Sequence, residues 1–313
     1  MDDGNNKSQH WSEYWKSGQL TSLPQDFVEN YSGEILDAWE SRFKTLSNNS
    51  KILDLCAGNC AVSILASQYS RNFDKNFKVT ATDAADINKK QIIERFPVVE
   101  RDIQNIEIVA NTYLEDLELA SANFDLITSQ YGIEYCDWKI AADKVYQLLK
   151  KRGEFTMISH SGSTDIIKQM EVERNDYLIL SNSKLLDQIR KFYTGKNDYF
   201  DFRDKLKKIQ PEIVRHFQKL NSPLLRSVLM LMDNLYHMSE IELTANKERI
   251  IGFVSQLQYA ELRMNDLLSV TQRINNNPNW YHAFEEKGLK LQTKKDIYYN
   301  SNQNSGVLYT FIK

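Results

Sequence analysis

The chain has 313 residues, 42% of them hydrophobic and 26% charged, and its net charge is −3. That length holds one large domain or a core with a smaller domain, and the near-neutral charge does not favour binding to a nucleic-acid backbone. No run approaches the roughly 18 apolar residues of a membrane-spanning helix, and the polar start of the chain does not resemble a secretion signal. Three cysteines are too few for a disulfide framework. We therefore expect a cytoplasmic protein with reduced thiols, and neither a nucleic acid nor a membrane as its partner.

The first 48 residues join an aromatic, turn-rich stretch to an amphipathic helix. The helix is predicted from Ile35, Leu36, Trp39 and Phe43, which recur at helical spacing. Because bulky rings precede this helix, we interpret residues 1–48 either as a lid over a ligand or as an aromatic cluster that anchors the terminus. The rings belong to His10, Trp11, Tyr14 and Trp15.

Residues 51–160 alternate between strand-like and helix-like segments. Apolar, β-branched runs predict strands at 51–56, 77–84, 106–113, 123–131 and 154–160. The last helix before the fifth strand is predicted over 138–153, with Gly153 as its stop. Its apolar face would comprise Ile140, Ala141, Val145, Leu148 and Leu149. Strands that alternate with helices of this length predict parallel crossovers and a doubly wound sheet.

The alternation stops after residue 160 and resumes only near the C-terminal end. Residues 164–276 carry helix-period segments alone. A break at 275–280 and a short helix precede two strands, 289–299 and 307–313, whose polar connection predicts an antiparallel hairpin at the sheet edge. The sequence therefore predicts an α/β fold. Its mostly parallel sheet has an antiparallel C-terminal edge hairpin, with a large all-helical insertion between the fifth and sixth strands.

These elements divide the chain into three parts. Residues 1–48 form the N-terminal lid, residues 49–163 and 279–313 form the α/β core, and residues 164–278 form the helical insertion. The apolar faces of the insertion could pack on one another, form a homodimer interface or line an acceptor pocket, and the sequence does not choose among these.

The most informative stretch is ILDLCAGNCA, residues 52–61. A strand ends in the acid Asp54, and a turn of small residues opens a helix. Such a turn lets backbone N–H groups approach a ligand closely, and the carboxylate can accept hydrogen bonds from a ligand amine or from water. The stretch resembles the first motif of class I S-adenosylmethionine-dependent methyltransferases, an acid followed by Gly-x-Gly-x-Gly. Here Gly58 matches the central glycine, and cysteines stand at positions 56 and 60.

The resemblance extends through the next three strands and implies a Rossmann-like core that binds S-adenosylmethionine. Asp83 ends the second strand, where an acid of the family holds the ribose hydroxyls, and Ala84 would lie beside the adenine. The same residues also suit other Rossmann-like nucleotide sites, although a dinucleotide fold would need Gly-x-Gly-x-x-Gly. The cofactor-binding residues that the resemblance implies are Asp54, Cys56, Ala57, Gly58, Asp83, Ala84, Asn111, Thr112, Ser129 and Gln130.

A general base is needed only if the acceptor loses a proton early. His160 follows the fifth strand at the carboxyl edge, and histidine titrates near neutrality, which makes it a candidate base. Tyr14 and Tyr131 are further catalytic candidates, and Glu134 is a rival. We expect no metal, because the two thiols of the turn have no further ligands beside them and make a poor zinc site.

The resemblance implies methyl transfer by in-line displacement at the sulfonium methyl. We expect a small-molecule acceptor, methylated on O, N or C, because apolar and aromatic lining favours small organic ligands. Two alternatives stay open. The chain could be a protein methyltransferase that docks its partner on the helical insertion, or a catalytically silent scaffold that acts through the same helices.

Overall fold

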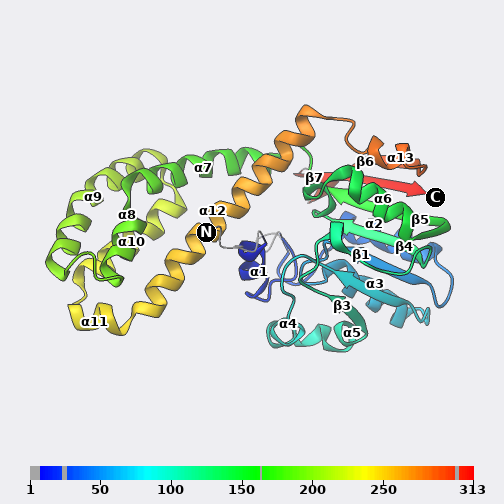
Figure 1. The fold of residues 1–313 in the computed structure, drawn as a ribbon, viewed down its shortest axis with the longest axis horizontal. Coiled ribbons are helices and arrows are strands. Elements are labelled where there is room, and N and C mark those ends of the chain that lie inside the picture. Colours follow the sequence, from blue (N-terminus) through cyan, green and yellow to red (C-terminus); the bar gives the residue numbers. More distant parts are fainter. Residues whose placement is uncertain (1–7, 23–26, 163, 300–302) are drawn as a thin grey trace. The chain divides into compact units, whose positions relative to one another are not determined.

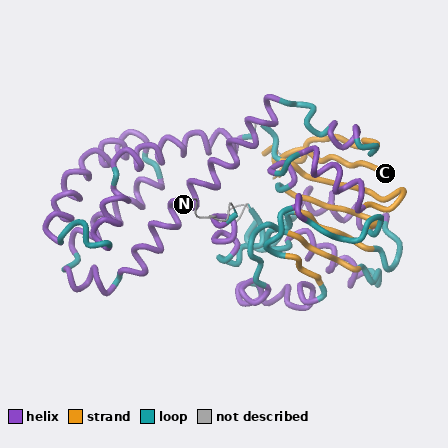
Figure 2. Tube along the Cα trace, viewed as in Figure 1, coloured by secondary structure: helices purple, strands orange, loops and turns teal. Residues whose placement is uncertain are grey.

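The computed structural model describes residues 8–22, 27–162, 164–299 and 303–313, and the chain divides into two compact units (Figure 1). The sheet unit comprises Met1–Asp165 and Ser269–Lys313, and the helical unit comprises Ile166–Leu268. Figure 2 shows that the strands of the described residues lie in the sheet unit. Because the sheet unit is discontinuous in sequence, the helical unit is an insertion in it.

The sheet unit is built on one seven-stranded sheet with the order β3-β2-β1-β4-β5-β7-β6. Strands β1 to β5 pair in parallel, whereas β7 runs antiparallel to both β5 and β6. This confirms the predicted α/β fold, its antiparallel edge hairpin and its insertion between β5 and β6. The strand order reverses between β1 and β4, and ligands of such sheets bind outside the carboxyl ends of the strands at this point. The strands are β1 (Lys51–Leu55), β2 (Lys78–Thr82), β3 (Ile106–Val109), β4 (Phe124–Gln130), β5 (Leu149–Ser159), β6 (Lys290–Tyr299) and β7 (Gln303–Ile312).

Helices cover both faces of the sheet, as the parallel strands require because they are apolar on both sides. On one face, α2 and α3 pack on each other and share a core with Ile52 of β1 and Val79 of β2. On the other face, α6 and α13 pack together over Phe155 of β5 and Phe311 of β7. The helices are α2 (Gly33–Thr45), α3 (Ala61–Asn72), α4 (Lys89–Arg95), α5 (Glu100–Gln104), α6 (Trp138–Leu148) and α13 (His282–Glu286), with short 3-10 turns at Pro97–Val99, Leu114–Asp116 and Ile133–Tyr135.

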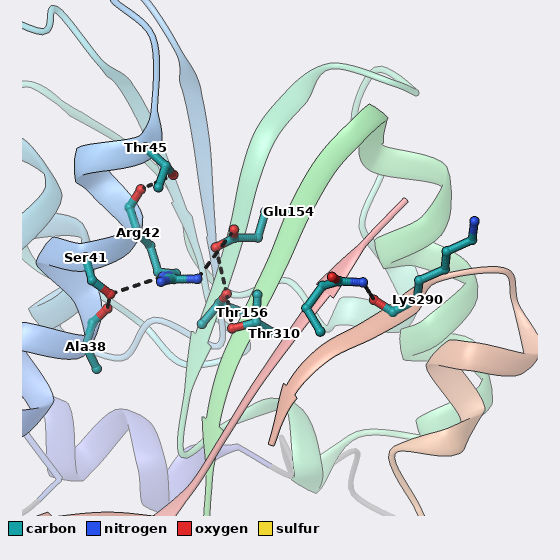
Figure 3. Close-up of polar contacts among 9 residues, drawn as sticks. Ala38, Ser41, Arg42, Thr45, Glu154, Thr156, Lys290 and Thr310 are labelled. Carbon is teal, nitrogen blue, oxygen red and sulfur yellow. Dashed lines mark hydrogen bonds and ion pairs between the residues drawn. The ribbon is translucent and has the colours of Figure 1, made fainter. Parts of the chain in front are cut away.

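A polar contact also ties α2 to the sheet (Figure 3). The Arg42 guanidinium lies 3.8 Å from Glu154 Oε2. The Thr156 hydroxyl lies 2.9 Å from Glu154 Oε1 and 3.1 Å from the hydroxyl of Thr310. Burial raises the pKa of Glu154, and the hydrogen bond from Thr156 and the charge of Arg42 oppose this rise. The contact joins α2, β5 and β7, so it holds the helix across the antiparallel part of the sheet.

The helix before β5 differs from the prediction in two ways. It ends at Leu148 rather than at Gly153, because Leu149 already pairs with Phe124 as the first residue of β5 and is fully buried. Ile140, expected on the buried face, is 41% exposed. The buried stripe of α6 consists of Ala141, Ala142, Val145 and Leu148.

The aromatic stretch near the start of the chain is a helix, α1 (Gln9–Trp15), and not the turn-rich segment that its composition predicts. Ser12 is buried on this helix, and Trp11 packs edge-to-face on Tyr135 with ring centroids 5.8 Å apart. Seven residues are too few for a stable isolated helix. Tertiary contacts therefore decide the conformation of α1.

The helical unit has a hydrophobic core of its own. Phe202 of α9 and Val228 of α10 are fully buried in it, and so are Leu225, Leu235 and Val254. The faces of the insertion thus pack largely on one another. The helices are α7 (Asp165–Ser183), α8 (Leu185–Tyr193), α9 (Tyr199–Leu220), α10 (Pro223–His237), α11 (Glu240–Ala245) and α12 (Lys247–Asn276), and residues 269–276 of α12 belong to the sheet unit.

Helix α11 is absent from the sequence prediction, although a capping box between Ser239 and Glu242 marks its start. Its six residues are too few to show a helical periodicity.

None of the helices that the structure describes is long and apolar enough to cross a membrane.

Two phenylalanines on α9 offer a matched test of the helical core. Phe202 is fully buried, whereas Phe200, two residues earlier, is 79% exposed. We expect Phe202→Ala to lower the free energy of unfolding of the helical unit by about 3–5 kcal/mol and Phe200→Ala to change it by less than about 0.5 kcal/mol. Urea unfolding of the full chain, followed by far-ultraviolet circular dichroism, measures both values. Equal effects of the two substitutions would show that this core is not packed as described.

Candidate functional site

The turn between β1 and α3 bends through three left-handed residues. Cys56, Gly58 and Cys60 have φ values of 54°, 51° and 66°, and these are the three glycine positions of the Gly-x-Gly-x-Gly motif. A left-handed conformation costs a residue with a side chain roughly 1–2 kcal/mol, so the two cysteines carry strain that glycine avoids. At Gly58 a Cβ would also overlap the indole ring of Trp15. Glycine is therefore required there both for its backbone angles and for space.

Asp54 stabilises this turn by hydrogen bonds to α3, which follows the turn, and to β4. Its Oδ2 accepts hydrogen bonds from the backbone N–H of Ser63 at 3.1 Å and from the Ser63 hydroxyl at 2.7 Å, and its Oδ1 accepts from the Thr128 hydroxyl at 2.9 Å. Burial raises the pKa of Asp54 to about 6, against these hydrogen bonds. Since the side chain is buried and both oxygens hold neighbouring residues, Asp54 fixes α3 against β4.

Asp83 joins the loops at the ends of the first three strands. Its Oδ2 accepts the Gly58 N–H at 2.8 Å and its Oδ1 accepts the Ala85 N–H at 2.7 Å. Its backbone carbonyl accepts the N–H of Thr112, and that of Ala85 accepts the N–H of Asn111. Burial raises the pKa of Asp83, and the two N–H groups only partly offset this. The structure thus brings Gly58, Asp83, Asn111 and Thr112 to one place.

Ala84 follows Asp83 and is partly exposed at the same edge. In the turn after β1, the Ala57 N–H donates to the carbonyl of Thr82 at 2.9 Å, so the end of β2 holds this turn as well. Ser129 is fully buried and accepts the N–H of Ile133 at 3.1 Å. Gln130 accepts the indole N–H of Trp39 through Oε1.

Helix α1 lies across the ends of β1 and β2 and is the dark blue helix of Figure 1. The Ser8 hydroxyl donates to the carbonyl of Ala84 at 3.0 Å, and the N–H of Asp86 donates to the Ser12 hydroxyl at 3.0 Å. The Asn59 amide donates to the carbonyl of Trp15 at 2.8 Å. Sequence reasoning did not find these contacts. The i, i+4 spacing of the two serines and of Trp11 and Trp15 was the available signal.

Two of the catalytic candidates use their hydroxyls on backbone carbonyls. The Tyr14 hydroxyl donates to Thr21 at 2.9 Å, and the Tyr131 hydroxyl donates to Ser305 at 2.8 Å. The third candidate, His160, stacks on the Tyr131 ring with centroids 4.7 Å apart and planes inclined by 18°. Burial lowers the pKa of His160 to about 4, so this imidazole is neutral at neutral pH.

Glu134 lies in the 3-10 turn Ile133–Tyr135, which follows β4 in the chain, and it is completely buried. Its Oε1 accepts the backbone N–H of His160 at 2.8 Å. Its Oε2 is buried and has no hydrogen-bond partner among the described residues. Burial raises the pKa of Glu134 to about 7, although the backbone N–H groups of His160 and Gly132 favour the charged form. The sequence named Glu134 only as a rival base, because its burial depends on how two distant loops meet.

The cysteines of the turn do not pair with each other. Cys56 Sγ lies 3.8 Å from Cys136 Sγ, and this contact together with burial raises the pKa of the Cys56 thiol. Cys60 is buried, which also raises its pKa. Its thiol lies 3.9 Å from the carbonyl oxygen of Gly58. All three cysteines are free, and the described part of the chain contains no group of three or more His, Cys, Asp or Glu residues that could hold a metal ion.

The sequence model of the ubiE/COQ5 methyltransferase family matches residues 31–199, which is more than half of the chain. The chain belongs to the ubiE/COQ5 methyltransferase family. It is therefore an S-adenosylmethionine-dependent methyltransferase, and S-adenosylmethionine is its methyl donor. The match begins before α2 and ends at the start of α9, so it covers the turn after β1 and the carboxyl ends of β1 to β5.

Several solved structures are similar to the methyltransferase. An S-adenosylmethionine-dependent methyltransferase from Aquifex aeolicus has 14% identity and a TM-score of 0.37 over 49% of this chain and 74% of its own. One from Mesorhizobium loti has 18% identity and a TM-score of 0.32 over 42% and 55%. A TehB-like methyltransferase from Corynebacterium glutamicum has 18% identity and a TM-score of 0.35 over 50% and 73%. The chain spans little more than half of the Mesorhizobium loti protein. No curated protein matches the chain.

The buried carboxyl of Glu134 predicts a pH dependence of stability. Its folded-state pKa of about 7 lies above the ordinary value of 4.5, so the folded protein holds this proton more tightly than the unfolded chain does. Stability is therefore lost as the pH rises from 4.5 to about 7. Between pH 5.5 and 8, this group lowers the free energy of unfolding by about 2 kcal/mol.

We expect Glu134→Gln to remove this loss. Relative to the unmodified protein, the variant should gain about 2 kcal/mol of stability on going from pH 5.5 to pH 8. Urea unfolding at the two pH values measures the difference, with Glu100→Gln at an exposed position of α5 as the control. A pH-independent difference between the Glu134→Gln variant and the unmodified protein would contradict the assignment.

Proposed function

We propose that this methyltransferase methylates a small-molecule acceptor, with its cofactor held across Gly58 and Asp83. The observation that supports this most is the Asp83 carboxylate at the point where the sheet order reverses, beside a turn that excludes a Cβ. When bound, the cofactor supplies a sulfonium methyl group to the acceptor. The protein contributes position and electrostatics.

The chemistry of the site fits this cofactor. The two oxygens of Asp83 hold backbone N–H groups of Gly58 and Ala85 and can accept the two ribose hydroxyls in their place. Ala84, Asn111 and Thr112 would frame the adenine. The Gln130 side-chain nitrogen is buried and has no partner among the described residues, so it can donate to the carboxylate of the cofactor.

The other proposed cofactor residues act through the turn itself. The backbone of Cys56, Ala57 and Gly58 would face the amino-acid part of the cofactor. Asp54 and Ser129 are buried, and their oxygens hold the backbone of α3 and of the loop after β4. We assign these two residues to the support of the turn and not to direct contact.

For the acceptor side we keep His160, Tyr14 and Tyr131 as the proposed residues. His160 is neutral at neutral pH, so its ring nitrogen can accept a proton, although a pKa of about 4 makes it a weak base. The hydroxyls of Tyr14 and Tyr131 already donate to carbonyls. These two rings would therefore serve mainly as walls that exclude water.

The remaining parts of the chain have proposed roles as well. Residues 1–48 would act as a lid, since α1 is fixed to the strand ends that hold the cofactor. The insertion, residues 164–278, would select the acceptor or form a homodimer. The exposed side chains Phe200 and Ile241 are its candidates for such an interface. We propose the cytoplasm as the compartment, which suits three free thiols.

Calorimetry with S-adenosylmethionine and S-adenosylhomocysteine tests the cofactor site. We expect Asp83→Ala to weaken binding of both by about 10- to 100-fold, because two hydrogen bonds to a charged acceptor are lost. Asp143→Ala removes a carboxylate of α6 from its ion pair with Lys287, which follows α13, and should leave the affinity unchanged. Equal affinity in Asp83→Ala and the unmodified protein would place the cofactor elsewhere.

Stopped-flow measurement of cofactor dissociation tests the lid. Trp15 covers Gly58 and its carbonyl accepts from Asn59. We expect Trp15→Ala to speed the dissociation of S-adenosylhomocysteine by about tenfold, because an aromatic ring over the cofactor turn is lost. Tyr146→Ala removes an exposed ring from α6 and is the control. Faster association without faster dissociation in Trp15→Ala would mean that this ring blocks the site instead of closing it.

A further inference from the structure

We propose that the acceptor is an amine that is cationic in solution, held in an aromatic corner of Trp11, Tyr135 and His160 and deprotonated by Glu134. The inference rests on the proposed function and names the acceptor class and the acceptor atom. It uses only residues of the sheet unit.

The three rings of the aromatic corner stand as adjoining walls. Trp11 and Tyr135 have centroids 5.8 Å apart and planes at 82°, and Tyr135 and His160 have centroids 6.0 Å apart and planes at 75°. Tyr131 backs the His160 ring in parallel at 4.7 Å. Trp11, Tyr135 and His160 are each partly exposed. Indole and phenol faces attract a cation within about 6 Å of the ring, so walls at near right angles can enclose an ammonium group from two sides.

The aromatic corner adjoins the cofactor turn. Trp11 and Trp15 are one helical turn apart on α1, which is about 5.4 Å along the axis, and Trp15 covers Gly58. Gly132, two residues before Glu134, packs on Cys56 of the same turn, because a Cβ added at Gly132 would lie 2.3 Å from the Cys56 Cβ. The loops that carry Asp83 and Glu134 therefore meet at one point, the turn that holds Cys56 and Gly58.

The charges around this point favour a cation. Asp54 and Glu134 supply buried carboxyl groups and Asp83 a half-buried one, and among the described residues none of the three pairs with a lysine or an arginine. The walls add no positive charge, because burial keeps the His160 imidazole neutral. A carboxylate, a phosphate or a phenolate would be repelled here, whereas an ammonium group would be attracted.

The unpartnered oxygen of Glu134 supplies the proton acceptor. Its carboxylate is joined to the aromatic corner through the backbone N–H of His160, and Oε2 is wholly buried without a partner among the described residues. An ammonium nitrogen has no lone pair, so it must first lose a proton, and Glu134 takes it. The amine lone pair then forms the N–C bond to the methyl carbon while the C–S bond breaks, and that electron pair remains on sulfur. The products are a methylated ammonium, a neutral thioether and the proton on Glu134, which leaves to solvent.

A matched pair of probes tests the cation preference without turnover. Choline carries a quaternary ammonium that cannot be methylated, and 3,3-dimethylbutan-1-ol is its neutral isostere. Calorimetry with S-adenosylhomocysteine present should give at least about tenfold tighter binding of choline. Trp11→Leu and Tyr135→Leu should each weaken choline binding severalfold, and Glu134→Gln should bring the two probes close to equal affinity.

The controls are Tyr146→Leu for the rings and Glu100→Gln for the carboxyl, and both should retain the full preference for choline. Equal affinity of the two probes in the unmodified protein would refute the proposal. So would a preference for choline that survives unchanged in Glu134→Gln, because the carboxylate would then play no part.

Turnover of an acceptor panel gives the second readout. Formation of S-adenosylhomocysteine should occur with primary and secondary amines and not with phenols or carboxylic acids of the same size. Cofactor binding is measured first on the same sample. A sample that binds S-adenosylmethionine but shows no preference for amines refutes the acceptor class alone. A folded sample that does not bind the cofactor refutes the proposed function, and the acceptor class with it.

Discussion

The bend from β1 into α3 is the constraint on which the rest of the site depends. Three alternate residues adopt left-handed conformations there, at Cys56, Gly58 and Cys60. The bend brings the Gly58 N–H onto the Asp83 carboxylate and leaves no room for a Cβ below Trp15. The loop after β3 attaches to the backbone around Asp83, and α1 attaches to Asn59. A different turn would therefore displace the loops of three strands and the N-terminal helix together.

Two buried acids, Asp54 and Glu134, and the half-buried Asp83 are the second feature of this site. Asp54, Asp83 and Glu134 all have raised pKa values, and in each case burial is the main cause. Carboxyl groups buried without a cationic partner lower the stability of the folded protein at neutral pH. Perturbed titratable groups of this kind gather at functional sites. A sulfonium cofactor carries the positive charge that these carboxylates lack.

The sheet unit and the helical unit have separate hydrophobic cores. The sheet has one apolar core on each face, formed with α2 and α3 on one side and with α6 and α13 on the other. The helical unit closes a third core of its own around residues such as Phe202 and Val228. Because these cores do not share side chains, the helical unit, Ile166–Leu268, can change in sequence without repacking the cores of the sheet.

The sequence by itself determined the fold class, the succession of strands and helices along the chain and the small-residue turn between β1 and α3. Those follow from local patterns, since apolar β-branched runs and helical periodicity act within about ten to twenty residues. Only the tertiary structure decided that α1 is helical, that α6 ends at Leu148 and that Cys56 lies beside Cys136. It also decided the burial of Glu134 against His160. Each of these depends on residues far apart in the chain meeting at one sheet edge, and no local pattern encodes such a meeting.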